Sequence, residues 1–181
     1  MISLRRPSPD HVTEYHASLA FAEPTCTPAD IPPPTFHRDV VHRSLGSGRA
    51  VLDQGRLGLE AWAAHRGAGV DVFPDDAALA EGTTVALVTR QLGLWVLAGC
   101  RVTHVVDEED RFGFTYATLP DHPEEGYETF LVVDHGDEVR FTIEAVSRPA
   151  TPLVELGLPV TRALQRRATN RYLDALQAWV G

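Results

Sequence analysis

Between residues 111 and 149, hydrophobic and polar positions alternate in the manner of antiparallel strands with one buried face. Val139, Phe141 and Ile143 alternate with charged or polar residues, and this period of two is typical of a half-buried strand. The preceding run, residues 127–133, leads into Asp134-His135-Gly136-Asp137, which has the composition of a tight hairpin. The pattern therefore predicts a β-hairpin in the second half of the chain.

Glu128 stands where this pattern expects an apolar residue. A loop of two or four residues pairs Val132 with Val139 and Glu128 with Ile143 on the inward face. A three-residue loop turns Glu128 to solvent, because a one-residue slip exchanges the faces. A carboxylate that faces a core must be paired, hydrogen-bonded or protonated, so Glu128 is the leading candidate for a functional site. The alternative is a glutamate near a strand end that reaches water or caps backbone N–H groups.

A second hairpin is predicted within residues 100–118, around an acidic turn. A loop of two or four residues places Arg101 opposite Tyr116, on a face whose other members are aromatic and which we expect to point inward. Arg101 and Tyr116 would then share the inner surface of one sheet with Glu128. Together they could orient a polar group of a ligand, or they could form a structural ion pair.

Two more side chains are candidates for the lining of a cavity on this sheet. His122 lies in the loop between Tyr116 and Glu128, where it either serves as a proton shuttle at the cavity mouth or is exposed to water. Trp95 belongs to the apolar run 94–97, which either covers a cavity or forms ordinary core. His65, near the end of a predicted helix, is expected to cap backbone carbonyls.

The remaining pattern predicts strands at 37–45, 70–73, 83–92 and 94–106, a helix at 51–66, and helical segments from Thr151 and from Val160. Residues 1–36 hold seven of the thirteen prolines, which predicts an extended or loop-like segment draped over a single domain of residues 37–181. Gly55 and Gly58 weaken the helix by about 1 kcal/mol each, so we expect close packing there.

The last helix carries an apolar stripe backed by basic residues. The stripe is Leu164, Ala168, Tyr172, Ala175, Leu176 and Trp179, and the basic residues are Arg162, Arg166, Arg167 and Arg171. A meander with one apolar face needs a cover, and only this helix is long enough. The predicted fold is therefore α+β, with a curved antiparallel sheet of about seven strands wrapped around the C-terminal helix. This outline resembles the helix-grip fold of the START and birch-pollen-allergen superfamily, whose members mostly bind apolar ligands.

Several motifs also resemble one family of bacterial and plant proteins, the domain of unknown function numbered nineteen-ninety. The densest part is Tyr116-Ala117-Thr118-Leu119-Pro120-Asp121-His122-Pro123, Glu125-Gly126 and Glu128-Thr129-Phe130, and further similar pieces include Trp62 with His65, Cys100-Arg101-Val102 and Ser147-Arg148-Pro149. Phe21 and Pro28 depart from the pattern, which has tyrosine and arginine there. The resemblance implies the helix-grip fold and supplies no established activity.

Composition limits the partners, the cellular compartment and the cofactors that we expect. With a net charge of −9, no nucleic-acid partner is expected, and the two cysteines do not make a disulfide framework. The N-terminus lacks the apolar core of a signal peptide, and no apolar run approaches the roughly 18 residues of a membrane span. We therefore expect a cytoplasmic protein without stable membrane insertion. The eight histidines have no metal-binding spacing and no cofactor motif is present, so no metal and no cofactor are expected.

Three functions follow from these features. The first is a binding protein for a small, largely apolar molecule with one polar end, held by Glu128, Tyr116 and Arg101. The second is an enzyme that uses Glu128 as general acid or base with Tyr116 or His122, although no recognised catalytic motif is present. The third is a non-catalytic interaction protein that uses the arginine face of the last helix. The oligomeric state is left open between a monomer and a weak dimer.

Overall fold

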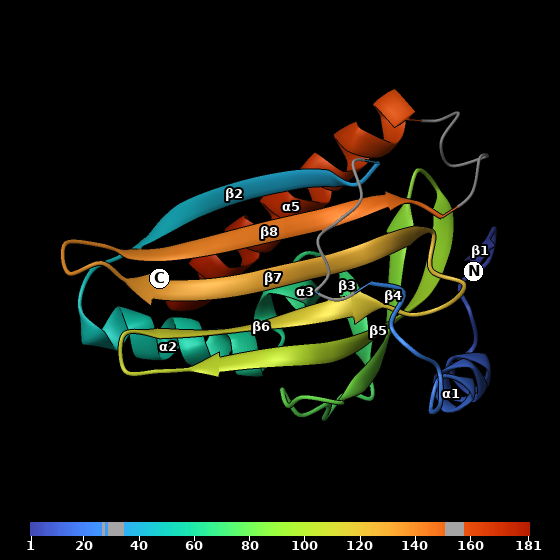
Figure 1. Cartoon of the computed structure of the whole chain (residues 1–181), viewed down its shortest axis with the longest axis horizontal. Coiled ribbons are helices and arrows are strands. Elements are labelled where there is room, and N and C mark those ends of the chain that lie inside the picture. The colour runs from blue at the N-terminus through green and yellow to red at the C-terminus, as the bar shows by residue number, and fades with distance from the viewer. Residues whose placement is uncertain (27, 29–34, 151–157) are drawn as a thin grey trace.

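The structure, a computed structural model, describes the chain except residues 27, 29–34 and 151–157, and gives only the backbone of residues 158–166. An eight-stranded antiparallel sheet curves around the long C-terminal helix (Figure 1). Seven strands follow the order β2-β8-β7-β6-β5-β4-β3, and β1 pairs with β5 beside this path. The strands are β1 Ile2–Ser3, β2 His37–Gly46, β3 Val70–Phe73, β4 Thr84–Gln91, β5 Leu94–Asp107, β6 Arg111–Thr118, β7 Glu124–Asp134 and β8 Val139–Pro149. The predicted α+β class and curved sheet are confirmed.

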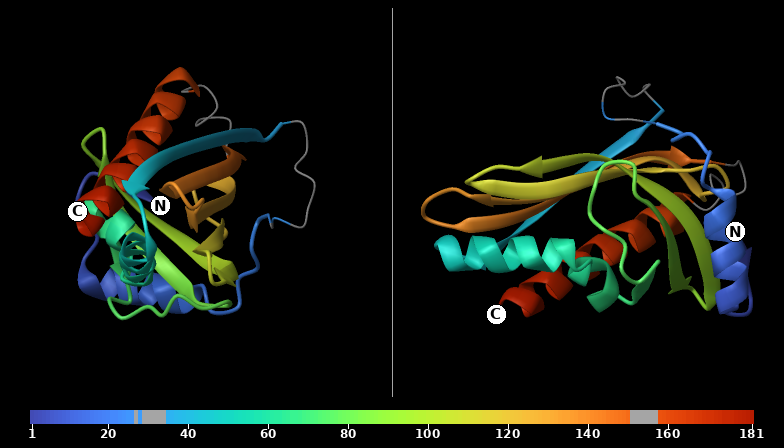
Figure 2. Two further views of the ribbon diagram at one scale, coloured as in Figure 1. Left: turned by 90° about the vertical axis from the view of Figure 1, so that its left-hand side faces the viewer. Right: turned by 90° about the horizontal axis from the view of Figure 1, so that it is seen from below.

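Three helices cover the inner, concave face of the sheet: α2 Arg49–Glu60, α3 Ala63–Gly67 and α5 Leu158–Val180. Figure 2 shows α2 and α5 on the same side of the sheet. The single helix predicted at 51–66 is broken at Trp62, which has a left-handed backbone with φ 56°. The Trp62 indole is buried and donates a hydrogen bond to the Ala77 carbonyl (3.0 Å), so a tertiary anchor determines the break. The helical segment predicted from Thr151 lies outside the described residues.

The N-terminal segment contains a helix that its proline content did not predict. Helix α1, Pro9–Ser18, has Ser8 as N-cap, and Pro9 stands in its first turn, where a missing N–H costs nothing. Tyr15 and Leu19 pack with Val88 and other apolar residues of β4 and β5 in a second core on the outer face of the sheet. The prediction of an extended or loop-like segment is therefore wrong for these ten residues.

Two predicted strand registers differ from the structure. In β7–β8, Glu128 pairs with Ala145 instead of Ile143, and this shift of two residues leaves Glu128 on the same face. In β5–β6 the register changes between Val102 and His104, as in a β-bulge, so Arg101 pairs with Ala117 and not with Tyr116. A bulge adds one residue to one strand, and one residue is enough to exchange the faces.

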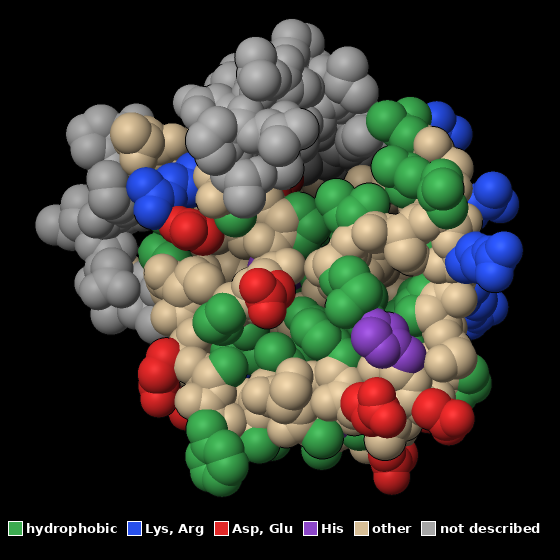
Figure 3. Space-filling model, turned by 90° about the vertical axis from the view of Figure 1, so that its right-hand side faces the viewer, with side chains coloured by type: hydrophobic (Ala, Val, Ile, Leu, Met, Phe, Trp, Pro, Cys, Tyr) green, Lys and Arg blue, Asp and Glu red, His purple; other side chains and the backbone are tan. Residues whose placement is uncertain are grey.

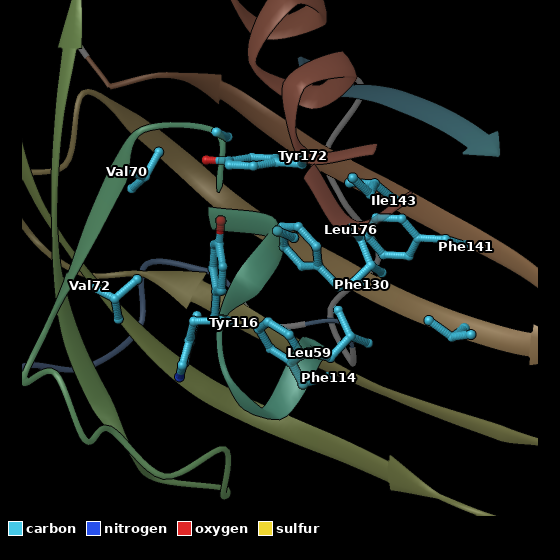
Figure 4. Close-up of a cluster of buried hydrophobic side chains, with 14 of the residues drawn as sticks. Leu59, Val70, Val72, Phe114, Tyr116, Phe130, Phe141, Ile143, Tyr172 and Leu176 are labelled. Atoms are coloured by element: carbon cyan, nitrogen blue, oxygen red, sulfur yellow. The ribbon is translucent and has the colours of Figure 1, made fainter. Parts of the chain in front are cut away.

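The main core lies between the sheet and the three helices and is rich in aromatic rings (Figure 4). Phe114, Phe130 and Phe141 are almost completely buried, and the rings of Phe114 and Phe130 stack 5.1 Å apart. A Cβ at Gly58 would lie 2.6 Å from Leu176 Cδ1, and one at Gly55 would lie 3.0 Å from Val132 Cγ1. The predicted close packing at both glycines is confirmed.

Candidate functional site

A cavity of about 370 Å³ lies between the inner face of the sheet and α5. Its walls are mostly apolar and are built from β4, β5 and the ends of β6, β7, β8 and β2; residues of α5 cover it. The lining includes Val41, Val70, Leu87, Val96, Ala98, Thr118, Gly126, Ala145, Ser147 and Ala168. Figure 3 shows a hollow on this side of the molecule with apolar side chains around it.

Tyr116 and Glu128 form a hydrogen-bonded pair on the cavity wall. They are direct partners across β6 and β7, and the Tyr116 hydroxyl donates to Glu128 Oε2 at 2.5 Å. Two residues along each strand, on the same face, Phe114 and Phe130 belong to the solid core. The pair therefore marks the inner end of the cavity, and Glu128 has the inward orientation that the alternation predicted.

Burial raises the pKa of Glu128 to about 7. The hydrogen bond from Tyr116 opposes this rise because it favours the carboxylate, and the nearby charge of Glu124 adds to it. The pKa of the Tyr116 phenol is raised well above its ordinary value, first by burial and then by Glu128. Near neutral pH, Glu128 is therefore present both as a proton donor and as a proton acceptor, whereas Tyr116 keeps its proton.

His65 lies directly behind this pair and was not predicted to belong to it. Its Nε2 is 3.4 Å from the Tyr116 hydroxyl oxygen, and its ring packs 4.8 Å from the rings of both Phe130 and Tyr172. Burial lowers the pKa of His65 to about 3, so the ring is neutral at physiological pH. The expectation that His65 caps helix carbonyls missed this position, although the resemblance of Trp62 and His65 to the family pattern was a usable signal.

Helix α5 contributes Tyr172 to the cavity wall. The sequence placed it in the apolar stripe, and its ring is buried as that stripe predicts. Figure 4 shows the hydroxyl groups of Tyr172 and Tyr116 on the same side of the aromatic cluster. Burial raises the pKa of Tyr172 well above its ordinary value, with Glu128 as the next cause. A second protonated phenol therefore stands near the inner end of the cavity.

His122 also lines the cavity. The imidazole is half-buried, and its Nδ1 lies 2.8 Å from the Glu124 carbonyl oxygen and 3.0 Å from the Glu124 amide nitrogen. Burial lowers the pKa of His122 to about 4, so this ring is neutral at pH 7. The ring is therefore only partly exposed, in contrast to the alternative of a histidine exposed to water.

Arg101 does not reach the cavity. Its guanidinium donates to the carbonyls of Ala22 (2.7 Å) and Leu19 (2.9 Å), and its Nε donates to Thr84 Oγ1 (2.9 Å). The prediction that Arg101 lies inside with Tyr116 is wrong, because the bulge in β5 turns Arg101 to the outer face. There it ties the segment after α1 to the sheet.

Trp95 also lies away from the cavity. Leu94 and Val96 line the cavity, so the residue between them points to the opposite face, where Trp95 packs against the second core. The guanidinium of Arg6 lies 5.3 Å from the centre of the Trp95 ring. The prediction of Trp95 as a ligand contact is therefore wrong.

Within the described ranges, no three His, Cys, Asp or Glu side chains are placed to hold a metal ion. In the same part of the chain, no helix combines the length and the apolar character needed to cross a bilayer.

Sequence comparison finds a family and a relative that this chain is similar to. The model of a family described as "Domain of unknown function (DUF1990)" matches residues 20–175. A "UPF0548 protein" of Deinococcus radiodurans is 32% identical over 201 aligned positions, which cover 97% of each chain.

Two solved structures share the fold at low sequence identity. Hypothetical protein jhp0584 from Helicobacter pylori has a TM-score of 0.59 and 15% identity, covering 81% of this chain and 88% of its own. Ara h 8.0201 has a TM-score of 0.51 and 10% identity, covering 80% of this chain and 97% of its own. These similarities show the helix-grip fold of the birch-pollen-allergen type.

Proposed function

The chain belongs to the family described as a domain of unknown function, DUF1990, and we propose that it binds a small, largely apolar molecule with a polar group in the cavity between sheet and α5. The observation that carries this proposal is an apolar-walled cavity whose inner end holds the Tyr116–Glu128 hydrogen bond. Its volume of about 370 Å³ falls within the range of roughly 300–1,000 Å³ that small-molecule pockets occupy.

The inner end selects the ligand by hydrogen bonding. A protonated Glu128 can donate to a carbonyl or hydroxyl oxygen, and an ionised Glu128 can accept from a hydroxyl. A purely apolar molecule in the cavity would displace water from Tyr116 and Glu128 without offering either of them a hydrogen bond. We therefore place the ligand's neutral polar group against Glu128 and its apolar body along Leu87, Val96 and Ala145.

The proposal includes a reducing cytoplasmic setting. Cys26 and Cys100 are both buried and neither forms a disulfide, which agrees with a compartment in which thiols stay reduced.

Native mass spectrometry and a thermal-shift screen with apolar alcohols, ketones and aromatic compounds test this function. We expect a co-purified ligand or a rise in Tm, and we expect Ala145→Leu to abolish it, because the added side chain occupies the cavity. The matched control is Thr142→Leu, which adds an apolar side chain on the other face of the same strand. Absence of binding across the screen, or equal binding by Ala145→Leu, would contradict the proposal.

A second candidate function is proton transfer on the bound molecule. The observation that favours it is the pKa of about 7 at Glu128, since a general acid or base works best when its pKa lies near the working pH. Tyr116 would hold the carboxylate in position, and His122, also on the cavity wall, would assist. Incubation in D₂O of a ligand with acidic C–H bonds tests this function. Deuterium uptake that is lost in Glu128→Gln supports catalysis, and uptake that is equal in both proteins excludes it.

A further inference from the structure

A second, smaller groove of about 70 Å³ lies beside the cavity and is lined by three arginines, Arg90, Arg167 and Arg171. It shares five lining residues with the large cavity: Val70, Thr89, Gln91, Ala168 and Tyr172. The two spaces are therefore neighbours, with the Tyr172 ring and its surroundings belonging to the walls of both.

Helix α5 brings two of the three arginines together, and the third lies on the neighbouring strand β4. Arg167 and Arg171 are four residues apart on α5 and so lie on one side of the helix. Arg90 is the penultimate residue of β4, beyond the last residue that pairs with the edge strand β3, since that pairing stops at Thr89 and Val70. The groove thus lies where the edge strand stops short and α5 passes the exposed end of β4.

These arginines differ from most others in the molecule in their partners. Eight arginines of the described chain form ion pairs with carboxylates. Among the described residues, no carboxylate lies within ion-pair distance of Arg90, Arg167 or Arg171. The Arg171 guanidinium instead lies close to Gly69, where an added Cβ would be 2.9 Å from its Nη2. The Arg90 guanidinium lies 6.0 Å from the Trp95 ring centre, on the outer face of the sheet, so Arg167 and Arg171 are the two cations that the groove offers.

The net charge of the chain is −9, yet Arg167 and Arg171 have no carboxylate partner among the described residues. The like charges of Arg167 and Arg171 repel each other along this small groove, and an anion in the groove would relieve that repulsion. The guanidinium group presents paired N–H donors that match the oxygens of a carboxylate or phosphate. The groove therefore has the composition of an oxyanion site adjoining an apolar cavity.

We propose that the groove binds the oxyanion headgroup, carboxylate or phosphate, of the same molecule whose apolar body occupies the cavity. This inference rests on the proposed function and specifies the ligand class as an anionic amphiphile. Glu128 supports the orientation, because an ionised carboxylate at the inner end repels an anion and favours a headgroup at the arginine groove. The neutral polar group of the ligand then faces Glu128.

Titration calorimetry with three compounds tests the inference on the full chain: decyl phosphate, decanol and inorganic phosphate. We expect decyl phosphate to bind at least about tenfold more tightly than decanol, since a charge-assisted hydrogen bond contributes enough for a factor of ten. Arg167→Gln/Arg171→Gln should remove that preference and leave decanol binding unchanged. The control is Arg111→Gln, which removes an exposed arginine of the β6 turn that pairs with Glu108 and does not line the groove.

Each outcome separates the two proposals. Equal affinity for decyl phosphate and decanol, or an unchanged preference in the double variant, overturns the oxyanion site and leaves the proposed function standing. Inorganic phosphate that binds as tightly as decyl phosphate shows a site for free anions, which contradicts a shared ligand. A parallel titration with vesicles that contain anionic phospholipid separates a membrane-surface contact from a cavity ligand, and binding to the vesicles alone contradicts the shared ligand as well. Failure of both decyl compounds to bind overturns the inference together with the proposed function.

Discussion

The concave face of the sheet has two halves that share the strands β6, β7 and β8. One half is filled with side chains and the other encloses a cavity. Below α2 and α3 the inward side chains are large: Phe112 and Phe114 on β6, Phe130 and Val132 on β7, and Phe141 and Ile143 on β8. Beside the lower-numbered part of α5 they are small or polar: Thr118 on β6, Gly126 and Glu128 on β7, and Ala145 and Ser147 on β8. The first half is a solid core and the second is a cavity.

This difference shows that side-chain size along one face, and not the backbone, determines where the space lies. The strands continue through both halves with the same alternation, so the curvature of the sheet alone does not create the cavity. Tyr116, Glu128 and His65 stand at the boundary, where the aromatic cluster seals the inner end. The polar pair thus occupies the position where dry packing meets open space.

The strongest test of this contrast is the removal of a ring from the filled half. Phe130→Ala should lower the free energy of unfolding by about 3–5 kcal/mol, because it leaves a cavity in a close-packed region. Val96→Ala, on the cavity wall, should cost about 1 kcal/mol or less, since one side of Val96 already faces open space. Urea unfolding of both variants measures the difference, and similar losses would contradict the division into two halves.

The next largest effect is the pH dependence of stability that His65 causes at the boundary between the filled half and the cavity. Its pKa in the folded state is lowered to about 3, so the stability that the neutral ring contributes is present above pH 6.5 and is lost as pH falls from 6.5 toward 3. His65→Gln should remove this acid dependence, and the two proteins should differ in pH sensitivity by about 3 kcal/mol between pH 7 and 4. Urea unfolding at both pH values measures it, with the exposed His104→Gln as control. Parallel curves for wild type and His65→Gln would show that the ring is not sealed from water.

A smaller effect of opposite sign is expected at Glu128. Its folded-state pKa is raised to about 7, so its contribution to stability is complete below pH 4.5 and is lost as pH rises through 7. Glu128→Gln should lack this loss and be more stable than wild type at pH 8 by about 1–2 kcal/mol, a value reduced because the carboxyl partly faces the cavity. Chemical unfolding at pH 4 and 8 measures the change, with the exposed Glu108→Gln as control. A variant that is less stable at pH 8 would mean that the carboxylate is well solvated.

The smallest effect is expected when side-chain volume is added to each half. Ala145→Leu should change the free energy of unfolding by less than about 1 kcal/mol, because the cavity accommodates the larger side chain. Ile143→Phe, two residues along the same face, should cost about 1–3 kcal/mol through overpacking. The two variants differ only in which half receives the extra atoms, so equal costs in thermal unfolding would show that the cavity is closed or already filled.

Part of this site could be predicted from the sequence because it depends on local alternation. Glu128 was placed inward although its predicted partner was wrong by two residues, since an even shift preserves the face. Tyr116 followed from the same reasoning, and the loop between them brought His122 to the cavity wall. The size gradient along β6, β7 and β8 was also present in the sequence and would have indicated which half is open.

Other residues depended on features that no local pattern contains. The bulge before His104 exchanges the faces of β5 and turns Arg101 outward, and a single inserted residue leaves no trace in the alternation of neighbouring strands. The position of His65 depends on the break at Trp62, which a buried hydrogen bond to Ala77 stabilises. Sequence reasoning therefore placed His65 at the end of a helix and missed its contact with Tyr116.

By itself, the sequence determined the main strands, the last helix and the arrangement of a sheet covered by that helix, and it favoured an inward Glu128, because periodicity and the need to cover an apolar face act over short ranges or on the fold as a whole. Only the tertiary structure decided which side chains meet Glu128, where the cavity ends and which arginines adjoin it. These depend on contacts between segments more than a hundred residues apart, such as His65 with Tyr172. Packing of that kind follows from the complete set of neighbours and not from the spacing of residues along the chain.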